Sequence, residues 1–272
     1  MMRLGLLASL GVALAAPLAA KQIEPADLER LPAADIYLLG ELHDNPVHHE
    51  NQARAVAAIA PSAVVFEMLS PAQAAAGADA DRADPQALEA ALGWSASRWP
   101  DFALYFPIFE RSGSAQIYGA ALPRDLVRGA VGTGAAAQFG PDAAAYGLDQ
   151  PLDAEEQSIR TEAQAVAHCN ALPEAILPGM VEAQRLRDAA FARTTVEALA
   201  DTGGPVVVIT GNGHARKDWG MPRFLRRVLP EARILSIGQI AGGPPEAEFD
   251  LWLSTVPSPD NGDPCEAFRK TN

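Results

Sequence analysis

The sequence predicts an α/β fold: three layers, with a mainly parallel sheet, helices on both faces of the sheet and a helical insertion or cap. Short apolar runs recur, and they are continuous rather than alternating, which is typical of strands buried on both faces of a parallel sheet. Alanine-rich helical stretches separate them, and this alternation of strand and helix indicates three layers. The expected strands cover residues 35–40, 62–67, 115–120, 205–210, 232–237 and 250–255.

The first residues have the layout of a secretory signal peptide. Arg3 precedes an apolar run, and small residues follow up to an expected cleavage point after Ala20. A buried N-terminal helix is the alternative. No cysteine lies near the cleavage point, and no later apolar run approaches the roughly 20 residues that cross a bilayer. We therefore expect a soluble, exported periplasmic protein without a lipid anchor, consisting of a signal peptide (1–20) and one domain (21–272).

Helix signals lie between the expected strands. Asn45 as N-cap and Pro46 as first helical residue predict a helix to about Ala60. Pro123 predicts the start of another helix. The remaining expectations are helical patterns over 154–168 and 174–200, helical insertions at about 70–112 and 141–200, and a loop over the glycine-rich stretch 129–147.

Charge and cysteine content restrict the function classes. A net charge of −13 and a pI near 4.8 exclude a nucleic-acid partner, because phosphate binding requires a basic face. Cys169 and Cys265 are expected to form a disulfide in an oxidising compartment, and two separate buried thiols are the alternative.

Ionisable side chains follow the expected strands. Glu41 and His43 follow the first strand within "GELH", Glu67 ends the second, and His214 follows the fourth within "GNGH". Since ligands of open parallel sheets bind at the carboxyl ends of the strands, these groups are expected to share one site. In both Gly-X-X-His motifs, the glycine is expected to permit a positive φ and a sharp turn.

This set supports two kinds of chemistry. Glu41, His43, Glu67 and His214 are candidate catalytic residues. Two imidazoles with Glu67 also suit a divalent metal such as Zn or Mn, with His43, His214 and Glu67 as ligands. The structural alternatives are a helix-entry hydrogen bond to Asp44 for His43 and a satisfied turn histidine for His214.

Further residues are candidates for cofactor binding. His48 and His49 lie on the helix after "GELH", as direct ligands or in packing. Three arginines are candidates to bind an anionic group through their guanidinium groups, and the alternative is that they form ion pairs with Asp125, Asp188 or Glu67. The aromatic segment 94–109 forms either core or the wall of a flat apolar ligand, with Tyr105 as an oxygen ligand for ferric haem. The arginines in question are Arg124, Arg187 and Arg216.

The chain resembles the ChaN-like haem-binding family of the Tiki superfamily. The matching stretches run through nearly all of the expected mature chain: "GELHDNPVHHENQ", "VVFEM", "RWPDFALYFPIF", "PRDLV", "HCNALPEAILPGMVEAQRLRDAAFA" and "ITGNGHARKDWGMPRFL". The resemblance implies an envelope protein that binds haem or another small anionic ligand and serves haem or iron uptake, with envelope transport partners and a homodimer that sandwiches the ligand. It also implies haem ligation through tyrosine.

The same superfamily implies an alternative function. Tiki metal-dependent proteases carry paired Gly-X-X-His motifs that resemble those ending at His43 and His214, with Glu67 matching their strand-end glutamate. Erythromycin esterases are similar as well. The alternative is therefore a metal-dependent hydrolase, and whether the protein is an enzyme stays open at this point.

Overall fold

The structure is a computed structural model that describes residues 20–258, 265 and 266. The expected signal peptide lies outside the described residues, apart from Ala20. Within the described part of the chain, no helix is long and apolar enough to cross a membrane.

The described residues form a seven-stranded sheet in which every neighbouring pair is parallel. This confirms the predicted α/β fold. All six expected strands are present, and a short N-terminal strand that was not expected is added at the edge. In the order β1-β7-β6-β2-β5-β3-β4, the strands are β1 (Lys21–Gln22), β7 (Leu251–Thr255), β6 (Ile234–Ala241), β2 (Ile36–Glu41), β5 (Val206–Gly211), β3 (Ala63–Phe66) and β4 (Gln116–Gly119).

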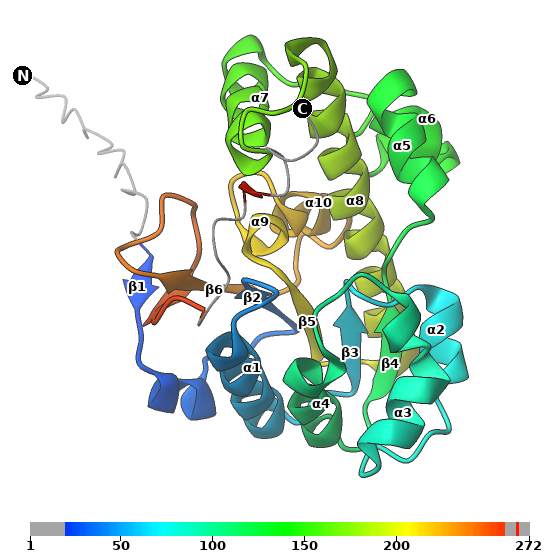
Figure 1. Ribbon diagram of the computed structural model, residues 1–272, viewed down its shortest axis with the longest axis vertical. Helices are drawn as coiled ribbons and strands as arrows, with labels where there is room; N and C mark the ends of the chain where they lie inside the picture. Colours follow the sequence, from blue (N-terminus) through cyan, green and yellow to red (C-terminus); the bar gives the residue numbers. More distant parts are fainter. Residues whose placement is uncertain (1–19, 259–264, 267–272) are drawn as a thin grey trace, which may run out of the picture.

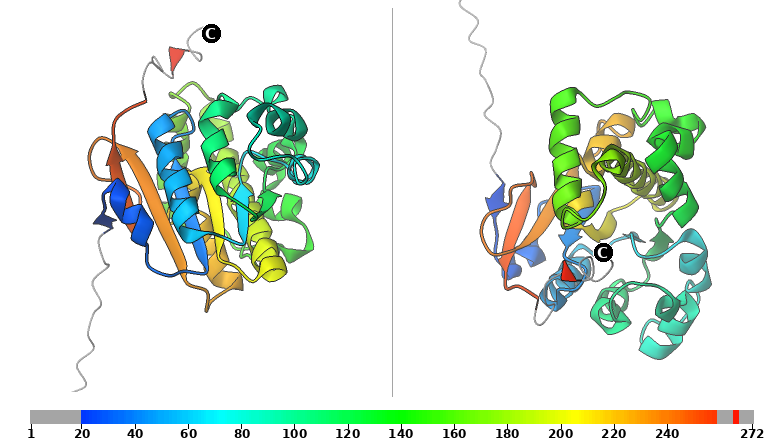
Figure 2. Two further views of the ribbon diagram at one scale, coloured as in Figure 1. Left: turned by 90° about the horizontal axis from the view of Figure 1, so that it is seen from below. Right: turned by 45° about the horizontal axis from the view of Figure 1, so that its top comes forward.

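Helices cover both faces of the sheet, and each face has its own apolar core. Successive strand residues point to opposite faces, so Leu38 packs into one core and Leu39 into the other. Figure 1 and the two views of Figure 2 show this layering. The helices are α1 (Pro46–Ile59), α2 (Pro71–Ala76), α3 (Pro85–Leu92), α4 (Phe102–Arg111), α5 (Arg124–Thr133), α6 (Ala135–Phe139), α7 (Ala154–Ala167), α8 (Leu177–Thr202), α9 (Asn212–Ala215) and α10 (Met221–Val228). Short 3₁₀ turns add η1 (Pro25–Arg30), η2 (Trp94–Ala96), η3 (Pro141–Ala144) and η4 (Glu174–Ile176).

Helices α5 to α8 form a helical cap. In Figure 1, α5, α6 and α7 gather at one end of the molecule, and α8 runs from them toward the sheet. The expected loop over 129–147 was wrong, because this stretch contains the end of α5, all of α6 and η3. Its glycines separate short alanine helices: Gly134 and Gly140 have φ values of +85° and +93°, which alanine rarely adopts.

Two local features match their sequence signals. The Asn45 side chain accepts a hydrogen bond from the N–H of Val47, and Pro46 opens α1, as the capping pattern predicts. Cys169, between α7 and α8, forms a disulfide with Cys265, which lies 96 residues further along the chain. The disulfide joins the cap to the C-terminal part of the protein.

Candidate functional site

Three adjacent strands deliver the ionisable groups to one place. Glu67 follows β3, which is hydrogen-bonded to β5, and β5 is in turn hydrogen-bonded to β2. The Oε1 atom of Glu67 lies 3.9 Å from Nε2 of His43 and 3.5 Å from Nε2 of His214. The structure therefore brings together residues that are 171 positions apart in the sequence (214 − 43), with the glutamate between two imidazoles.

Glu67 is held as a carboxylate. Its other oxygen, Oε2, accepts hydrogen bonds from the Thr210 hydroxyl at 2.7 Å and from the N–H of Gly211 at 2.8 Å. Burial alone would raise the pKa of Glu67, but His214, His43 and the N–H of Gly211 outweigh it and hold the pKa well below its ordinary value. The carboxylate is therefore charged at neutral pH and can act as a proton acceptor or as a ligand.

His214 lies between two carboxylates. Its Nδ1 atom is 2.6 Å from Oδ1 of the fully buried Asp188 on α8, and its Nε2 atom faces Glu67. Burial alone would lower the pKa of His214, but the negative charges of Glu67 and Asp188 raise it to about 10. The imidazole is therefore protonated at neutral pH in this structure.

His43 is oriented by a second buried carboxylate, Glu41. Nδ1 of His43 donates to Oε1 of Glu41 at 2.6 Å, and the hydroxyl of Tyr105 donates to the same oxygen at 2.8 Å. Burial alone would raise the pKa of Glu41, yet His43 and His49 beside it lower the pKa to about 2. Since Nδ1 is engaged by Glu41, the Nε2 atom of His43 is the one that faces Glu67.

The two helix histidines have different surroundings. His49 is buried, its ring lies 4.1 Å from that of Tyr105, and its Nε2 atom is 3.3 Å from Oε2 of Glu41. His48 accepts from the N–H of Leu42 at 2.8 Å and contacts the Thr255 hydroxyl at 2.7 Å. Burial lowers the pKa of His48 to about 4, so the ring is neutral and connects α1 to β7.

The glycines of the two motifs allow close approach of other side chains. A Cβ atom on Gly40 would lie 2.4 Å from Oδ1 of Asn212, and one on Gly211 would lie 3.0 Å from Nε2 of His43. Neither glycine has a positive φ. The expected left-handed turn was therefore wrong: each glycine is needed for space between neighbouring strand ends.

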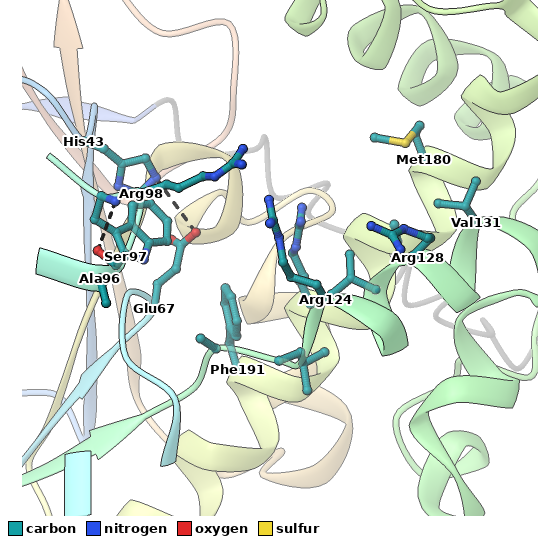
Figure 3. A pocket seen from close by; sticks show the side chains of 16 residues that line it. His43, Glu67, Ala96, Ser97, Arg98, Arg124, Arg128, Val131, Met180 and Phe191 are labelled. Atoms are coloured by element: carbon teal, nitrogen blue, oxygen red, sulfur yellow. Dashed lines mark hydrogen bonds and ion pairs between the residues drawn. The ribbon is translucent and has the colours of Figure 1, made fainter. Parts of the chain in front are cut away.

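A cavity of about 800 Å³ opens beside this cluster, between the sheet and the helical cap. Figure 3 shows His43 and Glu67 on one side of it, with Met180 and Val131 on the other. Its apolar lining comes mainly from Trp99, Leu122, Val127, Val131, Met180 and Phe191. Four arginines also line it, namely Arg98, Arg124, Arg128 and Arg187. The cavity lining therefore combines apolar side chains with four arginines, in a protein whose net charge is −13.

The predicted cofactor residues divide into two groups. Arg124 and Arg187 line the cavity. Arg216 instead forms an ion pair with Asp218 and stacks on Trp219 at 3.4 Å from the ring centre. Tyr105 has no exposed surface and lies behind Glu41, so it does not line the cavity. Most of the aromatic segment is core, whereas residues 96–99 contribute to the cavity wall.

Several residues at the site were not expected from the sequence. Asp188 was considered only as an ion-pair partner of an arginine, yet it contacts His214. Because Asp188 lies inside α8 and not at the end of a strand, the strand-end pattern did not predict it. Arg98 and Met180 lie in a loop and a helix whose positions over the cavity no local pattern predicts. Among residues 20–258, 265 and 266, no group of three or more His, Cys, Asp or Glu side chains has the arrangement of a metal site.

Comparison with known proteins provides further information on the site. A family model described as "Haem-binding uptake, Tiki superfamily, ChaN" matches residues 28–225. ChaN of Campylobacter jejuni, solved in a study of cofacial haem binding, superposes with a TM-score of 0.62 at 20% identity, covering 84% of this chain and 89% of that one. The type III effector HopBA1 is similar at a TM-score of 0.39 and 14% identity, covering 82% and 88%. No curated protein matches the chain in sequence.

Proposed function

Because the chain belongs to the ChaN family of haem-binding uptake proteins in the Tiki superfamily, we propose that it is an exported protein that binds haem in the cavity beside His43. The observation that carries the proposal is the lining of this cavity, which contains both apolar side chains and four arginines. In this proposal the protein takes part in haem or iron uptake.

The cavity lining fits the two chemical parts of haem. The porphyrin ring is flat and apolar, and side chains such as Trp99, Val131 and Phe191 offer the apolar surface that buries it. The propionates are carboxylates, and guanidinium forks bind carboxylates through paired hydrogen bonds. Arg124 and Arg187 would hold the propionates. Haem, when bound, supplies an iron that takes an axial ligand.

We propose that His43 would hold the haem iron. It is the one imidazole among the described cavity-lining residues, and no tyrosine of the described chain lines the cavity. Its Nδ1 atom is hydrogen-bonded to Glu41, an arrangement that fixes the ring and leaves Nε2 for a metal. Tyr105 and His49 would act behind it, because both contact Glu41, whereas His48 joins α1 to β7.

The disulfide supports the proposed location outside the cytoplasm. Disulfides persist in oxidising compartments such as the periplasm, and the chain contains one between Cys169 and Cys265. The C. jejuni relative was solved in a study of cofacial haem binding, so a homodimer that stacks two haem groups is part of this proposal. Envelope transport partners would receive or deliver the haem.

Haem titration of the purified protein tests the proposal. We expect a saturable Soret band at micromolar haem, and a weaker affinity by about tenfold or more when Arg124→Met and Arg187→Met are combined. Arg54→Met is the matched control, because Arg54 pairs with Glu29 on the outer surface of α1. His43→Ala should change the position of the Soret band and the electron paramagnetic resonance of the ferric state.

Two results would contradict haem binding at this place. The first is a protein that gives no spectral change with haem at micromolar concentration. The second is equal loss of affinity in the Arg54 variant and in the Arg124/Arg187 double variant. Sedimentation of the haem-loaded protein tests the homodimer separately.

The second candidate function is hydrolysis of an anionic substrate. It is favoured by the row of ionisable groups His43–Glu67–His214–Asp188, of which the last three are buried. The arginines that line the cavity would hold the substrate anion. A divalent metal on His43, His214 and Glu67 would polarise the scissile carbonyl and lower the pKa of bound water. Carboxylates on both Nδ1 atoms give the two rings the orientation of metal-binding histidines.

Metal content and esterase activity test this candidate. We expect protein purified without chelator to carry about one Zn or Mn and to hydrolyse an activated ester, and Glu67→Gln to lower the rate by about a hundredfold or more. Absence of stoichiometric metal, together with a rate unchanged in Glu67→Gln, would rule out the hydrolase.

A further inference from the structure

A second, smaller chamber lies on the other side of α8. It has a volume of about 30 Å³, and α7, α8, α10 and the loop after η3 supply its walls. Four guanidinium groups line it: Arg160, Arg185, Arg223 and Arg227. None of these residues lines the haem cavity. The residues that α8 contributes to that cavity are Met180, Ala183, Arg187 and Phe191. The two chambers are therefore separate, and α8 stands between them.

The chamber has more cations than carboxylates. Glu156 contacts both Arg160 and Arg223, and Glu182 pairs with Arg185 at 2.7 Å. Arg227 has no ion-pair partner among the described residues, and its guanidinium lies directly over Gly147, where an added Cβ would meet it at 2.5 Å. The buried Asp188, which contacts His214, also acts on Arg160 through its charge, so four positive charges have three carboxylates near them.

Two of the four arginines are buried, whereas Arg227 is exposed. Arg160 is 4% exposed and Arg185 is 5% exposed. Nη1 of Arg160 donates to Glu156, but its Nη2 atom is buried without a hydrogen-bond partner. Nη2 of Arg185 donates to the carbonyl of Gln150 at 2.8 Å. A buried donor without an acceptor destabilises a protein, so Nη2 of Arg160 favours an occupant with acceptor oxygens. The neighbouring guanidinium groups favour a negatively charged one.

We propose that this chamber binds one small inorganic oxyanion of the phosphate or sulfate class. An oxyanion presents several acceptor oxygens at short distances from one another, and arginine forks match that pattern with paired hydrogen bonds. The volume of about 30 Å³ exceeds what a single water molecule requires and favours a small ion. The anion would tie α7, α8 and α10 together through their arginines.

Calorimetric titration with inorganic phosphate and with sulfate at constant ionic strength tests this site. We expect saturable binding of one ion per chain, weakened about tenfold or more by Arg227→Met, since that variant removes the guanidinium without a carboxylate partner. Arg226→Met is the matched control, because Arg226 is the neighbouring arginine on α10, is exposed like Arg227 and does not line the chamber. Arg124→Met is the second control, because it tests binding in the haem cavity instead.

The outcomes separate the possibilities. Retained affinity in the Arg226 and Arg124 variants, with loss in the Arg227 variant, supports the site. Equal affinity in the Arg226 and Arg227 variants, loss only in the Arg124 variant, or no saturable binding by the unmodified protein overturns it. If Arg227→Met does not fold, Arg227→Lys keeps the charge without the fork and should still weaken binding. Haem affinity of the Arg227 variant should be unchanged, so the two sites fail independently.

Discussion

Replacing Asp188 by asparagine tests whether the buried charge row stabilises the protein. The pKa of His214 is about 10, against an ordinary value of 6.5. Since one pKa unit corresponds to about 1.4 kcal/mol, the shift represents about 5 kcal/mol of net favourable interaction with the protonated ring. Glu67 and Asp188 share this interaction. Burial raises the pKa of Asp188 itself and so offsets part of this interaction. Asp188→Asn should therefore lower the free energy of unfolding at pH 7 by at most about 2–3 kcal/mol.

The sign of the pH dependence follows from the direction of the shift. The folded-state pKa of His214 is raised, so its contribution is fully present below pH 6.5 and is lost as the pH rises through about 10. The difference between the unmodified protein and Asp188→Asn should therefore be full at pH 6 and small above pH 10. Urea denaturation across this range measures it, and ring proton resonances of His214 measure the fall in its pKa.

A surface carboxylate provides the control. Asp35 forms an exposed ion pair with Arg233, and such pairs contribute little to stability. Asp35→Asn should cost less than Asp188→Asn at every pH in the range. If both variants lose the same stability, or if the pKa of His214 stays near 10 without Asp188, the charge row does not have the energetic role given to it here.

Three further predictions concern other parts of the site. His48→Leu should lower the free energy of unfolding by about 1–3 kcal/mol, through loss of its two buried hydrogen bonds, and should leave the haem spectrum unchanged; chemical denaturation and haem titration check this. Gly211→Ala should displace His43, since the added Cβ would lie 3.0 Å from its Nε2 atom, and should shift the Soret band while far-ultraviolet circular dichroism stays the same. Cys169→Ser with Cys265→Ser should lower the free energy of unfolding by up to about 4–5 kcal/mol, because the bridge closes a long loop; unfolding with and without reductant should give the same value only in this variant.

The sequence predicted the centre of the candidate site better than its margins. His43, Glu67 and His214 each follow a strand of one parallel sheet, and the carboxyl ends of such strands meet at one edge. Local sequence therefore implied their proximity. Asp188 contacts His214 from the middle of α8, and only the packing of that helix against the sheet determines this contact, so no local signal predicts it.

The two helix histidines show a related limit. Helical periodicity brought both His48 and His49 near the strand ends, and both are buried there. Helical periodicity does not predict that Thr255, 207 residues further along the chain, contacts the ring of His48. The identity of the partner depends on where β7 joins the sheet, which is a property of the whole topology.

The placement of α8 constrains how this chain can change. One side of the helix faces the large cavity with Met180 and Arg187, and another presents Arg185 to the small chamber. Each residue turns a helix by about 100°. A one-residue insertion or deletion within α8 would therefore rotate every later side chain by about 100° about the helix axis, away from the cavity or chamber that it lines. A substitution changes one side chain and leaves the others in place. We therefore expect the length of α8 to vary much less among related proteins than the identity of its residues. An alignment of their α8 segments would check this expectation.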